Sequence, residues 1–163
     1  MELVRSGDAE QPPPRRRQTS AIRQALRVLA IQLSLLNHQV SARLELKDTD
    51  LDCLDLISRH GPLSPSALAQ LAGLHPATLT GVLDRLQKGG WITRERDAVD
   101  RRAVRLRALR ERSGELLGHY AGMNAALEQI CDDYSEAELE LIAGFLRRTT
   151  DAGQAATVEL TGP

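Results

Sequence analysis

The chain has 163 residues, a net charge of −1 and an apolar fraction of 42%, which suffices for one domain with helical extensions. Aromatic residues make up only 2%, so Leu, Ala, Ile and Val must form the core, and this composition favours helices. No apolar run approaches the length of a membrane span, and the N-terminus lacks the apolar region of a signal peptide. We therefore expect a cytoplasmic protein.

The small net charge hides an uneven distribution. Residues 76–112 hold ten basic and five acidic side chains, whereas residues 113–163 hold two basic and nine acidic ones. A basic cluster on an otherwise neutral chain predicts a polyanionic partner such as DNA. The alternative is a solvated charged loop.

The N-terminal part divides into a tail and a long helix. Residues 1–18 are rich in Pro, Arg and Gln and are expected to be a disordered tail. Residues 19–47 are predicted to form a dimerisation helix that begins near Thr19 or Ser20. Its apolar residues alternate at spacings of four and three, a heptad seam suited to packing on another long helix. They are Ile22, Leu26, Leu29, Leu33, Leu36 and Val40.

Residues 48–112 are predicted to form a winged helix-turn-helix. The first helix of this segment starts at an N-cap, Asp48 or Thr49, and ends at Gly61-Pro62. Its inner face is expected to hold Leu51, Cys53, Leu54 and Ile57. Two helices follow, from Ser64 to Ala72 and from Pro76 to about Lys88, and the turn Gly73-Leu74-His75 joins them as in a helix-turn-helix.

A β-hairpin is expected directly after these helices. The segments "WITRER" and "AVRLRAL" flank the loop "DAVDRR", and Val104 and Leu106 alternate with Arg105 and Arg107. Alternation of this kind indicates a strand with one face buried. The expected fold class is therefore mainly α with a small β-wing.

Residues 113–151 are predicted to form two further dimerisation helices. A second heptad seam runs through Leu116, Tyr120, Met123, Leu127, Ile130 and Tyr134. Ser135 and Glu138 form a capping box that starts the last helix, and residues 152–163 are expected to be a flexible tail. Because little else in the chain could cover both seams, we expect a homodimer with intertwined terminal helices. The residues assigned to dimerisation are Ile22, Leu26, Leu29, Leu33, Leu127, Ile130, Leu139, Ile142, Phe145 and Leu146.

The predicted DNA-contacting residues lie on the two short helices and the wing. The second short helix packs Leu79, Val82, Leu83 and Leu86 inward, which leaves a polar face for the major groove. Arg85 is expected to reach DNA, or else to pair with Asp84 or Asp100. One wing arginine would enter the minor groove while the other pairs with Asp97 or Asp100. The full set is Ser64, Ser66, Pro76, Ala77, Thr78, Thr80, Gly81, Arg85, Lys88, Arg94, Arg96, Asp100, Arg101 and Arg102.

The segment "GPLSPSALAQLAGLHPATLTGVLDRLQKGGWITRERDAVDRRAV" resembles the core of the MarR family of regulators. The most specific parts are "TGVLDRLQKGGWITRERD" and the D-x-x-D-R-R wing. The resemblance implies a cytoplasmic dimer, expected to be a repressor, that binds pseudo-palindromic promoter double-stranded DNA and responds to a small-molecule effector or an oxidant. It also implies an effector pocket, for which Leu35, His38, Leu54, Trp91 and His119 are candidates.

The chain departs from the family pattern at three points. His75 stands where Ser or Thr usually precedes the recognition helix, which here is the predicted helix from Pro76 to about Lys88. His75 should be a poorer N-cap than Ser or Thr. Ala98 stands where the wing usually has Pro. The Thr that often follows the last wing strand is absent.

The sequence lacks several motifs that would indicate a different function. Neither H-x-x-x-H nor C-x-x-C occurs, so we expect no metal and no cofactor. Cys53 and Cys131 are expected to be buried thiols, and three neighbouring aspartates should raise the pKa of Cys53, which weakens an oxidant sensor. The sequence contains no nucleophile–base motif and no phosphate-binding loop, so we do not expect an enzyme. A metal- or oxidant-responsive regulator of the same fold and a dimeric interaction module without DNA binding remain the alternatives.

Overall fold

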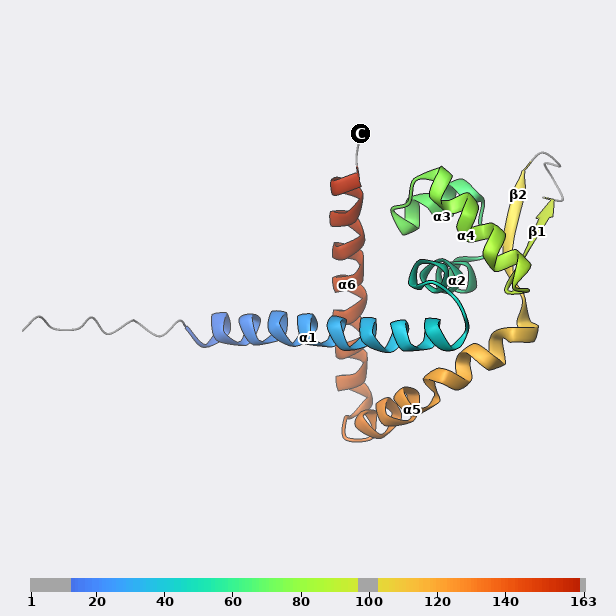
Figure 1. The fold of residues 1–163 in the computed structure, drawn as a ribbon. Helices are drawn as coiled ribbons and strands as arrows, with labels where there is room; N and C mark the ends of the chain where they lie inside the picture. Colours follow the sequence, from blue (N-terminus) through green and yellow to red (C-terminus); the bar gives the residue numbers. More distant parts are fainter. Residues whose placement is uncertain (1–12, 97–102, 162–163) are drawn as a thin grey trace, which may run out of the picture. The chain divides into compact units, whose positions relative to one another are not determined.

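The computed structural model describes residues 13–96 and 103–161 and is mainly helical, with one small antiparallel sheet (Figure 1). This confirms the predicted fold class. Its elements in chain order are α1 (Pro14–Arg43), α2 (Asp48–His60), α3 (Pro65–Ala72), α4 (Pro76–Lys88), β1 (Ile92–Arg96), β2 (Val104–Ala108), the 3-10 turn η1 (Arg110–Arg112), α5 (Ser113–Cys131) and α6 (Glu136–Thr161). The chain forms two compact units that divide between Gln39 and Val40.

The core of the second unit lies between α2, α3, α4 and the hairpin. The predicted inner face of α2 is buried as expected, with Leu51, Cys53, Leu54 and Ile57 each at most 3% exposed. Leu68 of α3 and Leu86 of α4 are fully buried in the same core. Each such side chain contributes roughly 1.5–3 kcal/mol through removal of apolar surface from water. The three helices and the hairpin therefore share one core and hold one another in place.

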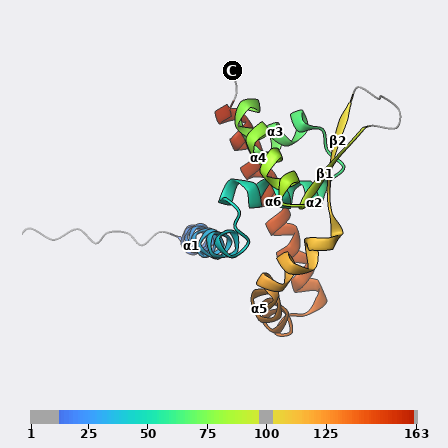
Figure 2. The same cartoon turned by 45° about the vertical axis from the view of Figure 1, so that its right-hand side comes forward.

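The two strands form the wing, and they lie side by side in Figure 2. Arg94 pairs with Leu106 in the antiparallel register. Leu63, just before α3, extends the sheet through two backbone hydrogen bonds with Leu106, of 3.1 and 2.7 Å. The predicted alternation holds only near the core: Leu106 is fully buried, whereas Val104 is 37% exposed. Val104 belongs to the outer part of the hairpin, which is exposed on both strands.

Two helix starts differ from the prediction. Helix α1 begins at Pro14 rather than near Thr19 or Ser20, because proline suits the first helical position and the carbonyl of Pro13 accepts hydrogen bonds from Arg16 and Arg17. The N-cap of α2 is Lys47 rather than Asp48 or Thr49. Its backbone N–H donates to the carboxylate of Asp50, at 3.3 Å, so the acid three residues later sets the boundary.

Helix α6 confirms one prediction and corrects another. The Ser135 N–H donates to Glu138 at 2.8 Å, and the Glu138 N–H donates to the Ser135 hydroxyl at 3.4 Å, as expected of a capping box. Hydrogen bonds from the Ser135 side chain and backbone lower the pKa of Glu138. The helix then continues to Thr161, so the flexible tail predicted from residue 152 is wrong for residues 152–161. Ala152, Ala155 and Ala156 favour helix, and no proline interrupts this stretch.

The long helices leave their apolar residues uncovered within the chain. Helix α5 has no buried residue, and Ile22, Leu29, Leu127 and Ile130 are between 43% and 56% exposed. Val40 is the exception in the first seam, because it is buried in the second unit. Although α1, α5 and α6 are long, no described helix is apolar enough to span a bilayer.

Candidate nucleic-acid interface

Helix α4 separates an apolar face from a polar one. Leu79, Val82, Leu83 and Leu86 are buried, as predicted from their spacing. The exposed positions carry small or polar side chains: Pro76, Ala77, Thr78, Thr80, Asp84, Arg85, Gln87 and Lys88. The Thr80 hydroxyl donates to the Pro76 carbonyl at 3.1 Å, which fixes its rotamer and leaves its oxygen able to accept a hydrogen bond. This face has the size and chemistry of one that can approach base edges.

His75 is the N-cap of α4. Its backbone is extended, and its Nδ1 atom accepts a hydrogen bond of 3.2 Å from the Ala77 N–H. An imidazole nitrogen thus replaces the hydroxyl oxygen of the usual Ser or Thr. His75 therefore does cap the helix through its side chain, and the expectation that it is a poorer cap than Ser or Thr stays a prediction.

Helix α3 begins with two hydroxyl groups. The Ser64 hydroxyl accepts from the Ala67 N–H at 3.1 Å and lies 3.0 Å from the Ser66 hydroxyl. Ser66 is exposed, and Pro65 occupies the first helical position. The predicted phosphate-contacting serines therefore lie together at the start of the helix-turn-helix.

Arg85 is bound within the protein. Its Nε and Nη2 atoms donate to the two carboxylate oxygens of Asp50 on α2, at 2.9 and 2.6 Å. The side chain of Asp50 is 1% exposed, that of Arg85 is 43% exposed, and the hydrogen bond to Asp50 raises the pKa of Arg85. The expected alternative of a pair with Asp84 is wrong, because a buried carboxylate on the neighbouring helix accepts from both Nε and Nη2. Asp100, the other expected partner, lies outside the described residues.

A glycine precedes Arg85 by one turn of α4. A Cβ atom at Gly81 would lie 3.4 Å from the Arg85 Nη1 atom, in direct contact with the guanidinium that Asp50 holds. This distance is an ordinary van der Waals contact, so the Asp50–Arg85 pair does not itself require glycine at position 81.

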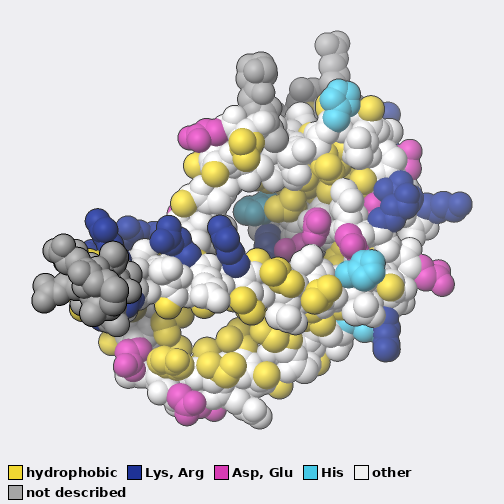
Figure 3. Space-filling model, turned by 60° about the vertical axis from the view of Figure 1, so that its left-hand side comes forward, with side chains coloured by type: hydrophobic (Ala, Val, Ile, Leu, Met, Phe, Trp, Pro, Cys, Tyr) yellow, Lys and Arg dark blue, Asp and Glu magenta, His cyan; other side chains and the backbone are white. Residues whose placement is uncertain are grey.

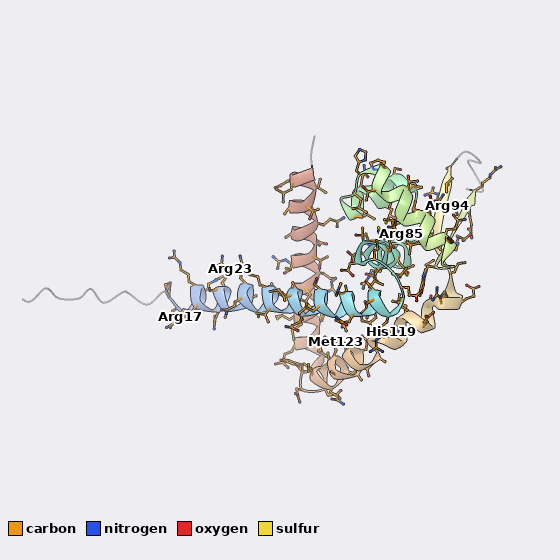
Figure 4. All side chains as sticks on the ribbon, viewed as in Figure 1. Arg17, Arg23, Arg85, Arg94, His119 and Met123 are labelled. Atoms are coloured by element: carbon orange, nitrogen blue, oxygen red, sulfur yellow. The ribbon has the colours of Figure 1, made fainter. Side chains whose placement is uncertain are left out.

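The hairpin arginines are partly engaged in ion pairs. Arg94 of β1 pairs with Asp84 of α4 at 2.5 Å, so it links the wing to the recognition helix (Figure 4). Arg107 pairs with Glu95 across the strands at 3.2 Å, and Arg96 is exposed at the end of β1. Asp97, Asp100, Arg101 and Arg102 lie outside the described residues, so the predictions for the wing tip remain predictions.

Arg112 connects the wing to both neighbouring helices, and the sequence did not reveal it. Its guanidinium lies 3.7 Å from the centre of the Trp91 ring and donates to the Gly89 carbonyl at 2.8 Å. It also pairs with Glu115 of α5 at 2.8 Å. The i,i+3 spacing of Arg112 and Glu115 was a readable signal. The interactions with Gly89 and Trp91 join residues about twenty positions apart, and no local pattern marks them.

The candidate effector residues have different surroundings. Trp91 lines a cavity of about 560 Å³ whose wall includes Lys47, Asp50, Arg85 and Arg112, but neither Leu54 nor His119. Leu54 is buried in the core, and His119 is half-buried on α5. Leu35 and His38 belong to the first unit. The cavity beside Trp91 therefore does not include Leu54 or His119, and the effector assignment of these residues stays a prediction.

The metal-responsive alternative depends on clusters of His, Cys, Asp or Glu side chains. In residues 13–96 and 103–161, no group of three His, Cys, Asp or Glu side chains could hold a metal ion.

Cys53 is buried as predicted, whereas Cys131 is only half-buried, on a helix without buried residues. Burial, then Asp52 and Asp50, raise the pKa of Cys53 from 9.0 to about 11.

We expect the two thiols to react at different rates. At pH 8 an aromatic disulfide reagent should modify Cys131 faster than Cys53, because the Cys53 thiolate is scarce and its sulfur is inaccessible. The raised pKa also means that Cys53 favours folding below about pH 9 and that this contribution is lost as the pH rises toward 11. Reaction time courses of C53S and C131S variants measure each thiol alone. Equal rates, or a faster Cys53, would contradict this assignment.

The fold and the candidate interface together define the structural class of this domain. A helix-turn-helix of α3 and α4, followed by an antiparallel hairpin with exposed arginines, is a winged helix-turn-helix. The MarR family profile matches residues 46–104, which cover α2, α3, α4 and β1 and reach the first residue of β2.

The relatives identify the family. An uncharacterised HTH-type transcriptional regulator of Bacillus subtilis (strain 168), YcgE, is 33% identical over 72% of this chain and 77% of its own length. The B. subtilis HTH-type transcriptional repressor YetL is 27% identical over 53% of this chain and 54% of its own. A mutant of S. aureus MepR bound to an oligodeoxyribonucleotide superimposes with a TM-score of 0.53 at 18% identity, covering 80% of this chain and 96% of its own. The chain belongs to the MarR family of transcriptional regulators.

Proposed function

We propose that the chain is a cytoplasmic homodimeric repressor that binds pseudo-palindromic promoter DNA and is modulated by a small-molecule effector. The observation that carries the proposal is the exposed polar face of α4 beside an arginine-bearing hairpin. Two comparisons support it: the relative YetL is named a repressor, and the MepR structure contains an oligodeoxyribonucleotide.

In this proposal α4 lies in the major groove. Thr78 and Thr80 hydrogen-bond to bases or contact a thymine methyl, and Pro76, Ala77 and Gly81 allow the helix to approach closely. Ser64 and Ser66 bind phosphate at the start of α3, where free backbone N–H groups add to the site. Lys88, Arg94 and Arg96 contact the backbone. The bidentate pair with Asp50 gives Arg85 a different role: it holds α4 on α2 and thereby orients the reading face.

The wing residues Asp100, Arg101 and Arg102 complete the contact with DNA in this proposal. In sequence they connect the two strands of the hairpin, which follows the recognition helix. An arginine placed in a narrow minor groove gains from its enhanced negative potential. An exposed ion pair in the loop would contribute only roughly 0–1 kcal/mol, so charge pairing alone explains the paired arginines poorly.

The dimer assignment rests on apolar residues that the single chain leaves uncovered. Leu127, Ile130, Phe145 and Leu146 are between 42% and 56% exposed, and the seam of α1 is likewise exposed at Ile22, Leu29 and Leu33. Uncovered apolar stripes of this length on soluble helices mark contacts with a partner. A second copy of the chain presents matching stripes, so we propose a homodimer through these helices.

The proposal also includes a site for the effector. Its support comes from the family and from a cavity of about 560 Å³ lined by Trp91 and Arg112. Asp50 and Arg85 also line this cavity, so an occupant could change how α4 sits on α2.

Selection of bound sequences from a pool of random duplexes tests the proposed function. We expect an inverted repeat whose half-site centres lie about one helical turn apart, roughly 34 Å, because two symmetry-related recognition helices must enter the same side of the duplex. Recovery of isolated half-sites would contradict the dimer, and recovery of no preferred sequence would contradict specific binding.

A further inference from the structure

The N-terminal half of α1 carries positive charge that the winged helix does not use. Helix α1 contains six arginines and no acidic residue in 30 residues, and five of these arginines fall between Arg15 and Arg27. Dark blue side chains accordingly gather on this part of α1 in Figure 3. These five arginines belong to the first unit, whereas the basic residues of the winged helix belong to the second.

Three of these arginines share one side of the helix. Arg16, Arg23 and Arg27 are seven and four residues apart, so they fall within about 40° around the axis and about 10 and 6 Å apart along it. All three are exposed. The apolar seam of Ile22, Leu26 and Leu29 lies about a third of a turn away, so a partner helix on the seam leaves the arginine face accessible.

The arrangement does not serve the stability of the helix. Positive side chains in the first turns oppose the positive end of the helix dipole. The helix also has no acidic residue at i+3 or i+4 to pair with them. An anion bound along this face would reduce both the mutual repulsion of the three arginines and the repulsion between Arg16 and the helix dipole.

We propose that the face formed by Arg16, Arg23 and Arg27 binds the phosphate backbone of double-stranded DNA. The inference rests on the proposed function, and it adds backbone contacts beyond those of α4 and the wing. A duplex offers a regular row of phosphates, and the planar guanidinium can donate two hydrogen bonds to each phosphate it meets.

The chemistry of α1 favours DNA over an anionic membrane surface. Helices that lie on membranes usually carry aromatic residues on their apolar face, and α1 has none. Its apolar residues instead follow the heptad spacing of a helix partner. Binding of DNA to the arginine face, with the apolar seam left free for a partner helix, is consistent with both observations.

The test compares two full-length variants with equal reductions in positive charge. R16Q/R23Q/R27Q removes the arginine face, and R59Q/R147Q/R148Q removes three arginines elsewhere; Arg59 is an exposed partner of Asp55. Affinity for a duplex selected with the wild type is measured between 50 and 200 mM salt. We expect the first variant to bind about tenfold or more weakly, with a salt slope smaller by about 0.9 for each phosphate that is no longer neutralised. The control should retain the wild-type slope.

Several results would overturn the inference. If both variants keep the wild-type slope, α1 does not contact DNA, although the proposed function still stands. If instead the arginine-face variant loses retention on vesicles of phosphatidylserine and phosphatidylcholine while its DNA binding is unchanged, the partner is a membrane. Helix content by circular dichroism confirms that both variants fold, and a wild type that binds no duplex refutes the proposed function itself.

Discussion

Replacement of both Arg101 and Arg102 by Ala is expected to weaken specific DNA binding by about 100-fold or more. Each arginine that contacts a groove or base edge is worth about 1–3 kcal/mol, and a dimer carries the change twice. Thermal stability and oligomeric state should not change, because exposed ion pairs contribute roughly 0–1 kcal/mol. The measurement is a titration of a selected duplex followed by fluorescence anisotropy.

The matched control for the wing is Arg107→Ala on the same hairpin. Arg107 is exposed and pairs with Glu95 across the strands, so its removal should weaken binding far less than the double change. If the double variant binds like the wild type, the wing does not enter the groove. If the control is equally weak, the effect reflects general charge rather than the wing tip.

Arg85→Ala is expected to cost about 3 kcal/mol of unfolding free energy, the lower end of the range for breaking a buried ion pair. The change leaves the Asp50 carboxylate, which is 1% exposed, without its charged partner. Asp50→Asn should cost less, because the Arg85 side chain is 43% exposed and water can solvate it. Urea denaturation of the two variants gives both values.

Arg59→Ala is the matched control for this pair. Arg59 also forms an ion pair, with Asp55 at 2.7 Å, but both side chains are more than half exposed. We expect a decrease of at most about 1 kcal/mol in unfolding free energy. An Arg85→Ala variant that is destabilised no more than this control would show that Asp50 is solvated and that the pair does not anchor α4.

Local signals in the sequence were sufficient for the helix-turn-helix and the wing. Pro65 and Pro76 mark the first positions of α3 and α4, and Gly73, with φ 62°, ends α3 in the left-handed conformation. The i, i+3, i+4, i+7 spacing of Leu79 and its neighbours predicted the buried face of α4. Each of these features depends on residues within one or two helical turns.

Interactions between distant residues were not predictable in the same way. Asp50 and Arg85 are 35 residues apart, and nothing near either residue identifies the other as its partner. The same is true of Arg112 and Trp91. The start of α1 was placed too late because the Pro- and Arg-rich composition predicted a disordered tail, although Pro14 suits the first helical position. The end of α6 was placed too early because the segment after Asp151 lacks a clear boundary signal, while its alanines favour helix.

The most direct test of the central claim is the mass and protection pattern of the complex with a selected duplex. Two symmetry-related chains, each with α4 in the major groove and a wing in the minor groove, predict two chains per duplex and two protected half-sites on one side of the DNA, roughly 34 Å apart. A complex with one chain, or protection of a single half-site, would contradict the account.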